Sequence, residues 1–402
     1  MSLGRGATHA LLLGLLLMLG AARPADAQFA TLDPAIATSV TLTPAQQDQI
    51  KQFIDQLRPA LFSDDLTEAK RALDTLLSPL QTEGVSVALR QAFADELADD
   101  IEKAIADERE MLVDVHGNKV INARPYTGLR LAGEIATNRM LGIVTGELAN
   151  KEQGRRFFAI HCTEMVFFAV EVSQPAVTAQ ALYHEERGKP AGLIGELGNL
   201  IVSEESPKNA AAIIRSLGEA GRIPDNQMGG VALAATRLIG ERVCDRVRTQ
   251  WKDDPGDEER LVWLTAGREV FPVVAQPDAG ADRDVAVAAI RLAGHLVASV
   301  YRDVEAKRVG GVDARQNDDA ALVQKRMLEL AGNLLIFGEQ RLAEATGRQP
   351  DPKIEQAAAD LEDSFVGSGG QNFRQAALSL VSVHGVLTDA PYGFKDDEFI
   401  AP

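Results

Sequence analysis

The chain has 402 residues, of which 46% are hydrophobic, and a formal net charge of −17 at pH 7. A chain of this length can bury a large core without disulfide bonds or metal ions. Binding to nucleic acids or to anionic membrane surfaces depends on Lys and Arg side chains, so the acidic balance argues against both. A protein or a cell-envelope component is the expected partner.

The first 27 residues have the three parts of an export signal. Arg5 lies in a short basic start, an apolar segment covers 10–20, and Ala25-Asp26-Ala27 provides a cleavage site of small residues. The apolar segment is about 11 residues long, whereas a bilayer span needs about 20, and no later segment is long and uncharged enough. We expect a mature chain from about Gln28, exported to the periplasm or the extracellular space and without an integral membrane segment. The alternative is an uncleaved anchor.

Beyond the signal, apolar residues recur at helical spacing along nearly the whole chain. The first helix is well delimited, because Thr43 can cap it, Pro44 suits its first turn and Gln46 completes a capping box. We expect helices over about 44–61, 66–80, 85–109, 125–148 and 154–172, from 177, 190 and 207 onward, over 228–251, 258–271, 284–308, 318–346 and 352–365, and from after Gly370 to about Leu387. The helix at 154–172 carries apolar residues on nearly every side, which is typical of a fully buried helix.

Alternating apolar residues around a Gly-Asn turn predict one small β-hairpin at 113–121, with an irregular loop as the alternative. We divide the chain into a signal peptide (1–27), an N-terminal helical unit (28–111), a helical repeat domain (112–387) and a C-terminal tail (388–402). In the tail, Tyr392, Phe394 and Phe399 are expected to dock on the last helix rather than to contact a partner.

A short motif, Leu-Arg-Leu-Ala-Gly-Glu at 129–134, returns in variants along the chain. The variants lie at 193–197, 216–220, 237–241, 291–296 and 329–334. A glycine in a helix interior costs about 1 kcal/mol relative to alanine, so a glycine at the centre of an apolar stripe predicts the close approach of a neighbouring helix. The alternative is chance recurrence in an alanine-rich helical chain.

The motif resembles the Leu-Gly-x-Leu segments of the HEAT-like and armadillo-type α-solenoid superfamily. The glycines at 133, 195, 240, 294 and 332 are separated by about 38 to 62 residues, around the two-helix unit of about 40 to 47 residues in such arrays. The resemblance covers about 121–386 and implies a stacked helical scaffold with a concave surface, without any particular chemistry. The expected fold class is all-α, an irregular stack of antiparallel helical hairpins with at most one small β-hairpin. The sequence leaves open whether the stack is an open arc or a closed ring.

Few residues are candidates for chemistry. His161 and Glu164 are three apart on one helix and could share a face, as a metal pair or as a general base with its orienting carboxylate, but a satisfied core histidine is the simpler interpretation. Cys162 and Cys244 both fall on apolar helices, where they could form a disulfide in an oxidising compartment or remain separate buried thiols. A closed zinc site and a di-iron centre both need more ligands than the chain supplies at suitable spacing.

Three further clusters favour structural roles. Gly367–Gly370 has the composition of a phosphate cradle but lacks the preceding strand and the Lys, so we interpret it as a helix breaker. The acidic turn at 253–259 does not match a calcium loop and predicts solvated charges, with Asp257 as a helix cap. The arginines could line a groove for an anionic ligand, but on helices they more often pair with neighbouring acids. They are Arg155, Arg156, Arg242, Arg246 and Arg248.

The sequence therefore assigns no catalytic, cofactor-binding or metal-binding residue and predicts a non-catalytic exported scaffold or binding protein. The alternative is a secreted α/α-toroid enzyme acting on polysaccharide, in which two carboxylates would serve as acid and base. Polysaccharide clefts rely on aromatic side chains, and two Trp and four Tyr in 402 residues argue against that alternative. The oligomeric state is left open.

Overall fold

The structure is a computed structural model. It describes residues 31–109, 111–113, 119–173, 175–250, 255–276, 282–306, 318–363, 387–388, 392–395 and 397–399. The export signal at 1–27, the Gly367–Gly370 segment and the last expected helix up to residue 386 lie outside the described residues.

The described chain is helical along most of its length, as the sequence predicts. The single helix expected over 125–148 is instead two helices, because the chain turns at Ala136, which has a positive φ of 50°. Its first half contains α2 (Pro34–Ala37), α3 (Pro44–Leu61), α4 (Leu66–Leu77), η2 (Ser78–Gln81), α5 (Val87–Ile105), β1 (Met111–Val113), β2 (Lys119–Ile121), α6 (Arg124–Ile135), α7 (Asn138–Glu147), α8 (Gln153–Val172), α9 (Ala179–Leu182), β3 (His184–Glu186) and β4 (Lys189–Ala191). Its second half contains α10 (Gly192–Ser203), α11 (Pro207–Ala220), α12 (Asp225–Met228), α13 (Val231–Gln250), α14 (Asp257–Ala275), α15 (Arg283–Glu305), α16 (Asp318–Thr346) and α17 (Pro352–Asp363).

Side-chain caps define where several of these helices begin. The Thr43 hydroxyl accepts a hydrogen bond from the Gln46 N–H, and the Gln46 side chain accepts one from the Thr43 N–H, which completes the predicted capping box of α3. Asp65 caps α4, and Ser206 caps α11 in the same way. Each cap satisfies backbone N–H groups that the first helical turn leaves without partners.

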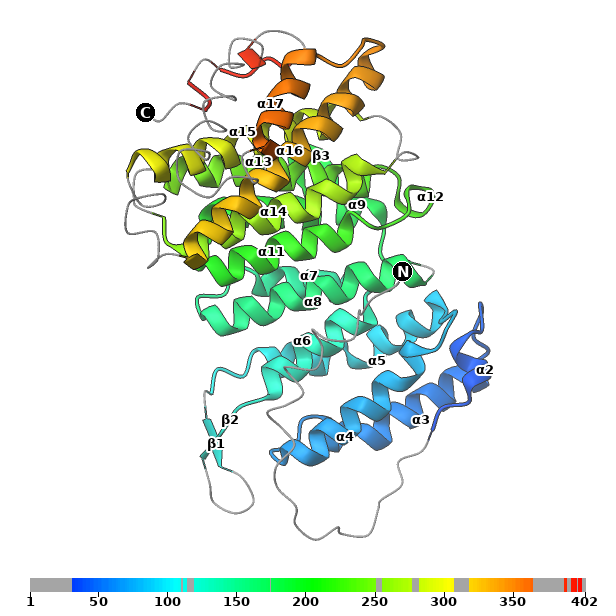
Figure 1. Ribbon diagram of the computed structural model, residues 1–402. Helices are drawn as coiled ribbons and strands as arrows, with labels where there is room; N and C mark the ends of the chain where they lie inside the picture. Colours follow the sequence, from blue (N-terminus) through cyan, green and yellow to red (C-terminus); the bar gives the residue numbers. More distant parts are fainter. Residues whose placement is uncertain are drawn as a thin grey trace.

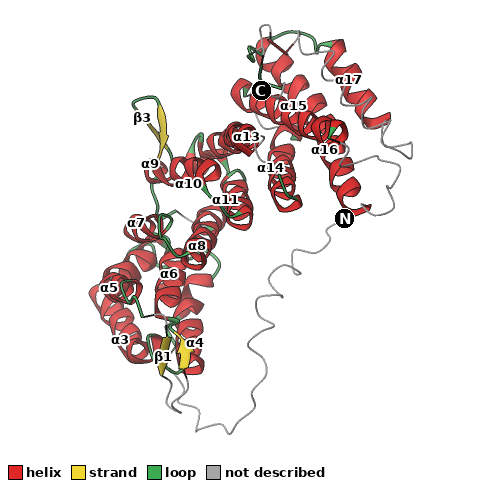
Figure 2. Ribbon diagram, turned by 90° about the vertical axis from the view of Figure 1, so that its left-hand side faces the viewer, coloured by secondary structure: helices red, strands yellow, loops and turns green. Residues whose placement is uncertain are grey.

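The helices stack in two layers. One layer contains α5, α7, α10, α13 and α15, and the other contains α4, α6, α8, α11, α14 and α16, each helix contacting the next in its layer. Successive helices across the layers form antiparallel hairpins, from α5–α6 to α15–α16. Figure 1 shows α3 and α17 at opposite ends of the stack, so the described helices form an open arc and not a ring. Figure 2 shows that the arc curves with the α8, α11, α14 and α16 layer on its concave side.

Two short hairpins interrupt the helices. Strands β1 and β2 pair antiparallel, with Met111 opposite Ile121, which confirms the predicted hairpin. Strands β3 and β4 form a second hairpin that was not predicted, and the helix expected from Pro190 begins instead at Gly192. The two-residue loop of this second hairpin is Arg187-Gly188. Both residues have positive φ, which is the geometry of a type I′ turn.

Gly133, Gly240 and Gly332 lie against neighbouring helices, as predicted, whereas Gly195 and Gly294 do not. A Cβ at Gly133 would lie 3.0 Å from the Cys162 carbonyl oxygen on α8, and one at Gly240 would lie 3.0 Å from the Ala288 carbonyl oxygen on α15. Gly332 is buried at an ordinary contact distance from α17. Gly133 and Gly240 therefore confirm the close approach of a neighbouring helix, whereas Gly332 shows an ordinary helix contact.

The spacing of the motif glycines does not correspond to the length of the helical-hairpin repeat. Gly133 and Gly332 belong to the concave layer, whereas Gly195, Gly240 and Gly294 belong to the other layer. Gly195 meets the Pro190 backbone of the nearby hairpin, and Gly294 meets a ring of the C-terminal tail. The first helices of successive hairpins begin instead at residues 87, 138, 192, 231 and 283.

Helix α15 corrects one expectation about apolar segments. Arg283–Asp303 is long and apolar enough to cross a membrane by length and composition alone. Its most apolar window is 78% buried inside the stack, between α13, α14 and α16. The apolar composition of α15 is therefore that of a core helix enclosed by other helices.

Candidate functional site

An apolar strip lies exposed on α8. Phe157, Phe168 and Val172 are 39%, 56% and 55% exposed, and their spacing of eleven and four residues places them on one helix face. The opposite face is buried, as Ala159 and Val166 show. The sequence predicted a helix buried on all sides, and this prediction is wrong, because one face has no covering helix among the described residues.

The direction of this α8 strip follows from the neighbours of the helix. Helix α8 contacts α6 and α11 within its own layer and α7 in the other layer. Its remaining face therefore points away from α7, toward the concave side of the arc (Figure 2). The exposed apolar side chains of the strip therefore lie on the concave side of the arc.

His161 and Glu164 lie within the α8 strip. The His161 Nδ1 is 2.8 Å from the Glu164 Oε2, which confirms that the two share a face. Both side chains are partly exposed, so His161 is not the core histidine that the simpler interpretation assumed. Among the described residues, no group of three or more His, Cys, Asp and Glu could hold a metal ion.

A charged network borders the strip on α11 and α14. The Arg222 guanidinium contacts Glu269 at 2.8 Å and also Glu219. Burial raises the pKa of Glu269 above its ordinary value, against the opposing effect of Arg222. Gly218 makes room for this carboxylate, because a Cβ there would overlap the Glu269 side chain. The network contains both signs of charge and links two neighbouring helices of the concave layer.

The two cysteines are both free and buried, which corrects the disulfide alternative. The backbone of Cys162 faces Gly133 on α6, in the concave layer. Cys244 lies on α13, in the other layer, within electrostatic range of Arg291 on α15. Since the cysteines belong to different layers and different hairpins, they do not pair. Burial raises the pKa of both thiols, which disfavours a reactive thiolate.

The arginine clusters pair with acids, as the simpler interpretation predicted. Arg246 is the most deeply buried: its guanidinium contacts Glu259 at 2.6 Å and also donates to the carbonyl oxygens of Ile201 and Glu204. The Trp263 indole donates to the same Glu259 carboxylate. The other pairs are Arg155–Glu147, Arg156–Glu204, Arg242–Asp245 and Arg248–Glu398. In the described part of the acidic turn, Glu259 is buried against Arg246 instead of solvated. The prediction of Asp257 as a helix cap is wrong, because Gly256 is the N-cap of α14 and Asp257 is its first helical residue.

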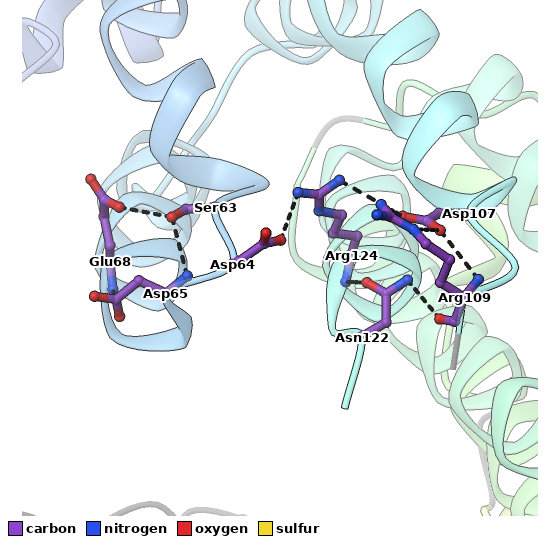
Figure 3. A network of polar contacts seen from close by, with 8 residues as sticks. All are labelled: Ser63, Asp64, Asp65, Glu68, Asp107, Arg109, Asn122 and Arg124. Carbon is purple, nitrogen blue, oxygen red and sulfur yellow. Dashed lines mark hydrogen bonds and ion pairs between the residues drawn. The ribbon is translucent and has the colours of Figure 1, made fainter. Parts of the chain in front are cut away.

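A polar network that the sequence did not indicate closes the base of the β1–β2 hairpin (Figure 3). Arg124 contacts Asp64 at 2.6 Å and Asp107 at 3.7 Å, and the Asn122 side chain donates to the Arg109 carbonyl oxygen. Hydrogen bonds from Arg109 hold the pKa of Asp107 well below its usual range. The network ties the α3–α4 turn, the end of α5 and the start of α6 together, so we assign it a structural role.

An open groove of about 570 Å³ lies between α5 and α7. Its two arginines, Arg139 and Arg155, contact Asp99 at 2.7 Å and Glu147 at 2.8 Å. The groove is bordered mainly by α5 and α7, with Arg155 from the first turn of α8 at its edge, and both of its arginines already form pairs. It is a weaker candidate than the α8 strip.

The described residues of the C-terminal tail dock on α15 and α16, whereas the last expected helix, on which docking was predicted, lies outside the described residues up to 386. Tyr392 contacts α16, and Phe399 lies against α15. Between them, Glu398 accepts hydrogen bonds from Arg291 and His295 and is paired with Arg248. The sequence singled out the aromatic residues and missed Glu398, whose partners lie more than a hundred residues away in the sequence.

No protein-family model matches the chain, and no curated protein is significantly similar to it in sequence. The class of the protein therefore follows from its architecture, an open two-layer stack of antiparallel helical hairpins with an exposed apolar strip on the concave layer.

Proposed function

We propose that this protein is an exported, non-catalytic scaffold of the HEAT-like α-solenoid kind, and that its concave layer binds a protein partner of the cell envelope or extracellular space. The observation that carries the proposal is the α8 strip, three large apolar side chains exposed on the concave side of the arc. Exposed apolar patches rimmed by polar residues mark interaction sites on soluble proteins.

The strip suits an amphipathic helix as its occupant. Phe157 and Val172 are fifteen residues apart on α8, which corresponds to about 22 Å along the helix axis. A helix of about four turns covers that length and anchors through residues at i, i+4 and i+7. The mixed charges of Arg222, Glu219 and Glu269 beside the strip would fix the orientation of such a helix.

Site-specific photo-crosslinking tests the proposal in cells that produce the protein. A benzophenone side chain at Phe168 should yield a discrete adduct. The same group at Gln91, an exposed position on α5 in the other layer, should not yield it. The adduct at 168 should disappear when Val172 is changed to Ser. Equal adducts from both positions, or none at 168, would overturn the proposal.

Export and the lack of catalysis are tested separately. Mass spectrometry of the exported protein should place the mature N-terminus at about Gln28. The open arc supports a scaffold over the α/α-toroid alternative, since a toroid closes on itself. Turnover in a screen of the purified protein against common polysaccharides would establish the enzyme alternative instead.

A further inference from the structure

The tail residue Glu398 enters a pocket between α13 and α15. Its carboxylate accepts hydrogen bonds from Arg291 at 2.6 Å and from His295 Nε2 at 2.8 Å, and Arg248 approaches it at 3.2 Å. The side chains of Glu398 and His295 are 4% and 0% exposed. Three donors from two helices thus converge on one carboxylate, which is a strong arrangement for binding an acidic group.

The next residue fills an aromatic half of the same pocket. The Phe399 ring packs against the α15 backbone at Gly294, where an added Cβ would overlap the ring. The ring meets His295 edge-on, with centroids 5.3 Å apart, and Phe394 at 5.5 Å. Gly294 belongs to the repeated motif, and here the glycine admits an aromatic side chain instead of a helix.

A second anchor holds the start of the tail. The Tyr392 hydroxyl donates to Glu339 on α16 at 2.6 Å, and the Arg348 guanidinium lies over the Tyr392 ring at 5.6 Å. The residues from 392 to 399 therefore reach α13, α15 and α16 with two anchors, near the end of the chain that is red in Figure 1.

The tail contacts the helices through side chains, in the way that a bound peptide ligand does. The Glu398 N–H donates a hydrogen bond to Lys395 within the tail, and the Phe394 N–H donates to the carbonyl oxygen of Leu387, the residue that precedes the tail. The described links of the tail to α15 and α16 run through the side chains of Tyr392, Glu398 and Phe399. The tail can therefore leave these helices without breaking their backbone hydrogen bonds, and the pocket would remain.

We propose that Arg248, Arg291, Gly294 and His295 form a peptide-binding site for a Glu-Phe segment. The tail is its resident ligand, and a second acidic and aromatic segment of the same sequence can replace it. The basic groups select the carboxylate, and the glycine floor selects the aromatic ring that follows it. This site lies on α13 and α15, in the layer opposite the α8 strip, so it is independent of the function proposed above.

The test uses the full chain with a weakened resident ligand. A fluorescein-labelled peptide of residues 388–402 is titrated by anisotropy against the Glu398→Gln/Phe399→Ala variant. It should bind at least about tenfold tighter than to the unsubstituted chain, where the attached tail competes at high effective concentration. Lys395→Gln is the matched control, because the Lys395 side chain is exposed, and it should behave like the unsubstituted chain.

Two further binding measurements test the specificity of the site. Adding Arg291→Ala to the double variant should abolish binding, and a peptide with Gln and Ala in place of Glu398 and Phe399 should not bind. Equal binding to the double variant and the unsubstituted chain, or no binding by a double variant with a native circular dichroism spectrum, overturns the proposal.

A second measurement, made on the unsubstituted chain, tests the proposal if the double variant does not fold. Excess peptide added to the unsubstituted chain must accelerate hydrogen exchange at the Phe394 and Glu398 amides, and no acceleration also overturns it.

Discussion

Gly133 of α6 lies directly against Cys162 of α8, so that a Cβ on the glycine would stand 3.0 Å from the Cys162 carbonyl oxygen and 3.1 Å from its Cβ. The contact involves backbone, which cannot rotate away as a side chain can. Of the motif glycines, Gly133 thus shows the predicted close approach of two helices in the concave layer most directly.

Replacing Gly133 by Val should therefore destabilise the protein. The side chain would force α6 and α8 apart, and overpacking of this kind costs about 1 to 3 kcal/mol. Gly142 on α7 is the matched control, because a Cβ there would meet nothing within 4 Å. Gly142→Ala should raise the free energy of unfolding by about 0.5 to 1 kcal/mol. Urea unfolding measures both, and a neutral Gly133→Val would contradict the close contact.

Removing one member of the buried Arg246–Glu259 pair should be costly. Their side chains are 1% and 7% exposed, so Arg246→Met leaves the Glu259 carboxylate buried without its main partner. Such changes cost about 3 to 5 kcal/mol. Arg246→Met with Glu259→Gln should recover part of the loss in urea unfolding. Arg139→Ala, which breaks an exposed pair with Asp99, should change stability by less than about 1 kcal/mol.

Local chemistry accounts for the parts of the fold that the sequence predicted. The capping box of Thr43 and Gln46 and the hairpin that begins at Met111 both depend on residues close in the chain. The β3–β4 hairpin was missed because Arg187-Gly188 is a weaker turn signal than Asn-Gly, and its strands carry charged residues instead of apolar alternation.

The candidate sites depend on long-range relationships that no local pattern contains. The apolar residues of α8 occupy every side, so periodicity could not indicate which face the other helices leave exposed at Phe168. Glu398 binds His295 across 103 residues of sequence, and only the docked tail brings them together. The glycine spacing misled for the same reason, since Gly133 and Gly240 serve different layers of the stack.

Acidification should release the tail. Burial opposes ionisation of Glu398, but hydrogen bonds from His295 and Arg291 outweigh it and hold its pKa at about 2, below the ordinary 4.5. Burial, helped by Arg291 and Arg248, holds the pKa of His295 below its ordinary 6.5 despite Glu398. Glu398 therefore binds more protons in the released tail than in the docked tail. Docking is weakened as pH falls between 4.5 and 2.

Hydrogen exchange of the Phe394 and Glu398 amides, corrected for the intrinsic pH dependence, measures this release. Other charged groups at the pocket are Asp245, 3.5 Å from Arg291, and Asp397, 4.0 Å from Arg248. The Glu398→Gln variant should lose the part of the response below pH 4.5. Protection that increases on acidification would show that the sign is wrong.

Two adjacent phenylalanines separate the binding role of α8 from its structural role. Phe167 is 0% exposed and Phe168 is 56% exposed, so one belongs to the core and the other to the strip. Phe167→Ala should lower the free energy of unfolding by about 3 to 5 kcal/mol, because it leaves a cavity in the core. Phe168→Ala should change it by less than about 0.5 kcal/mol, as surface substitutions do, while reducing the fluorescence of an apolar dye bound to the folded protein. If Phe168→Ala instead destabilises the protein as much as Phe167→Ala, the side chain is buried and the α8 strip is not a docking surface.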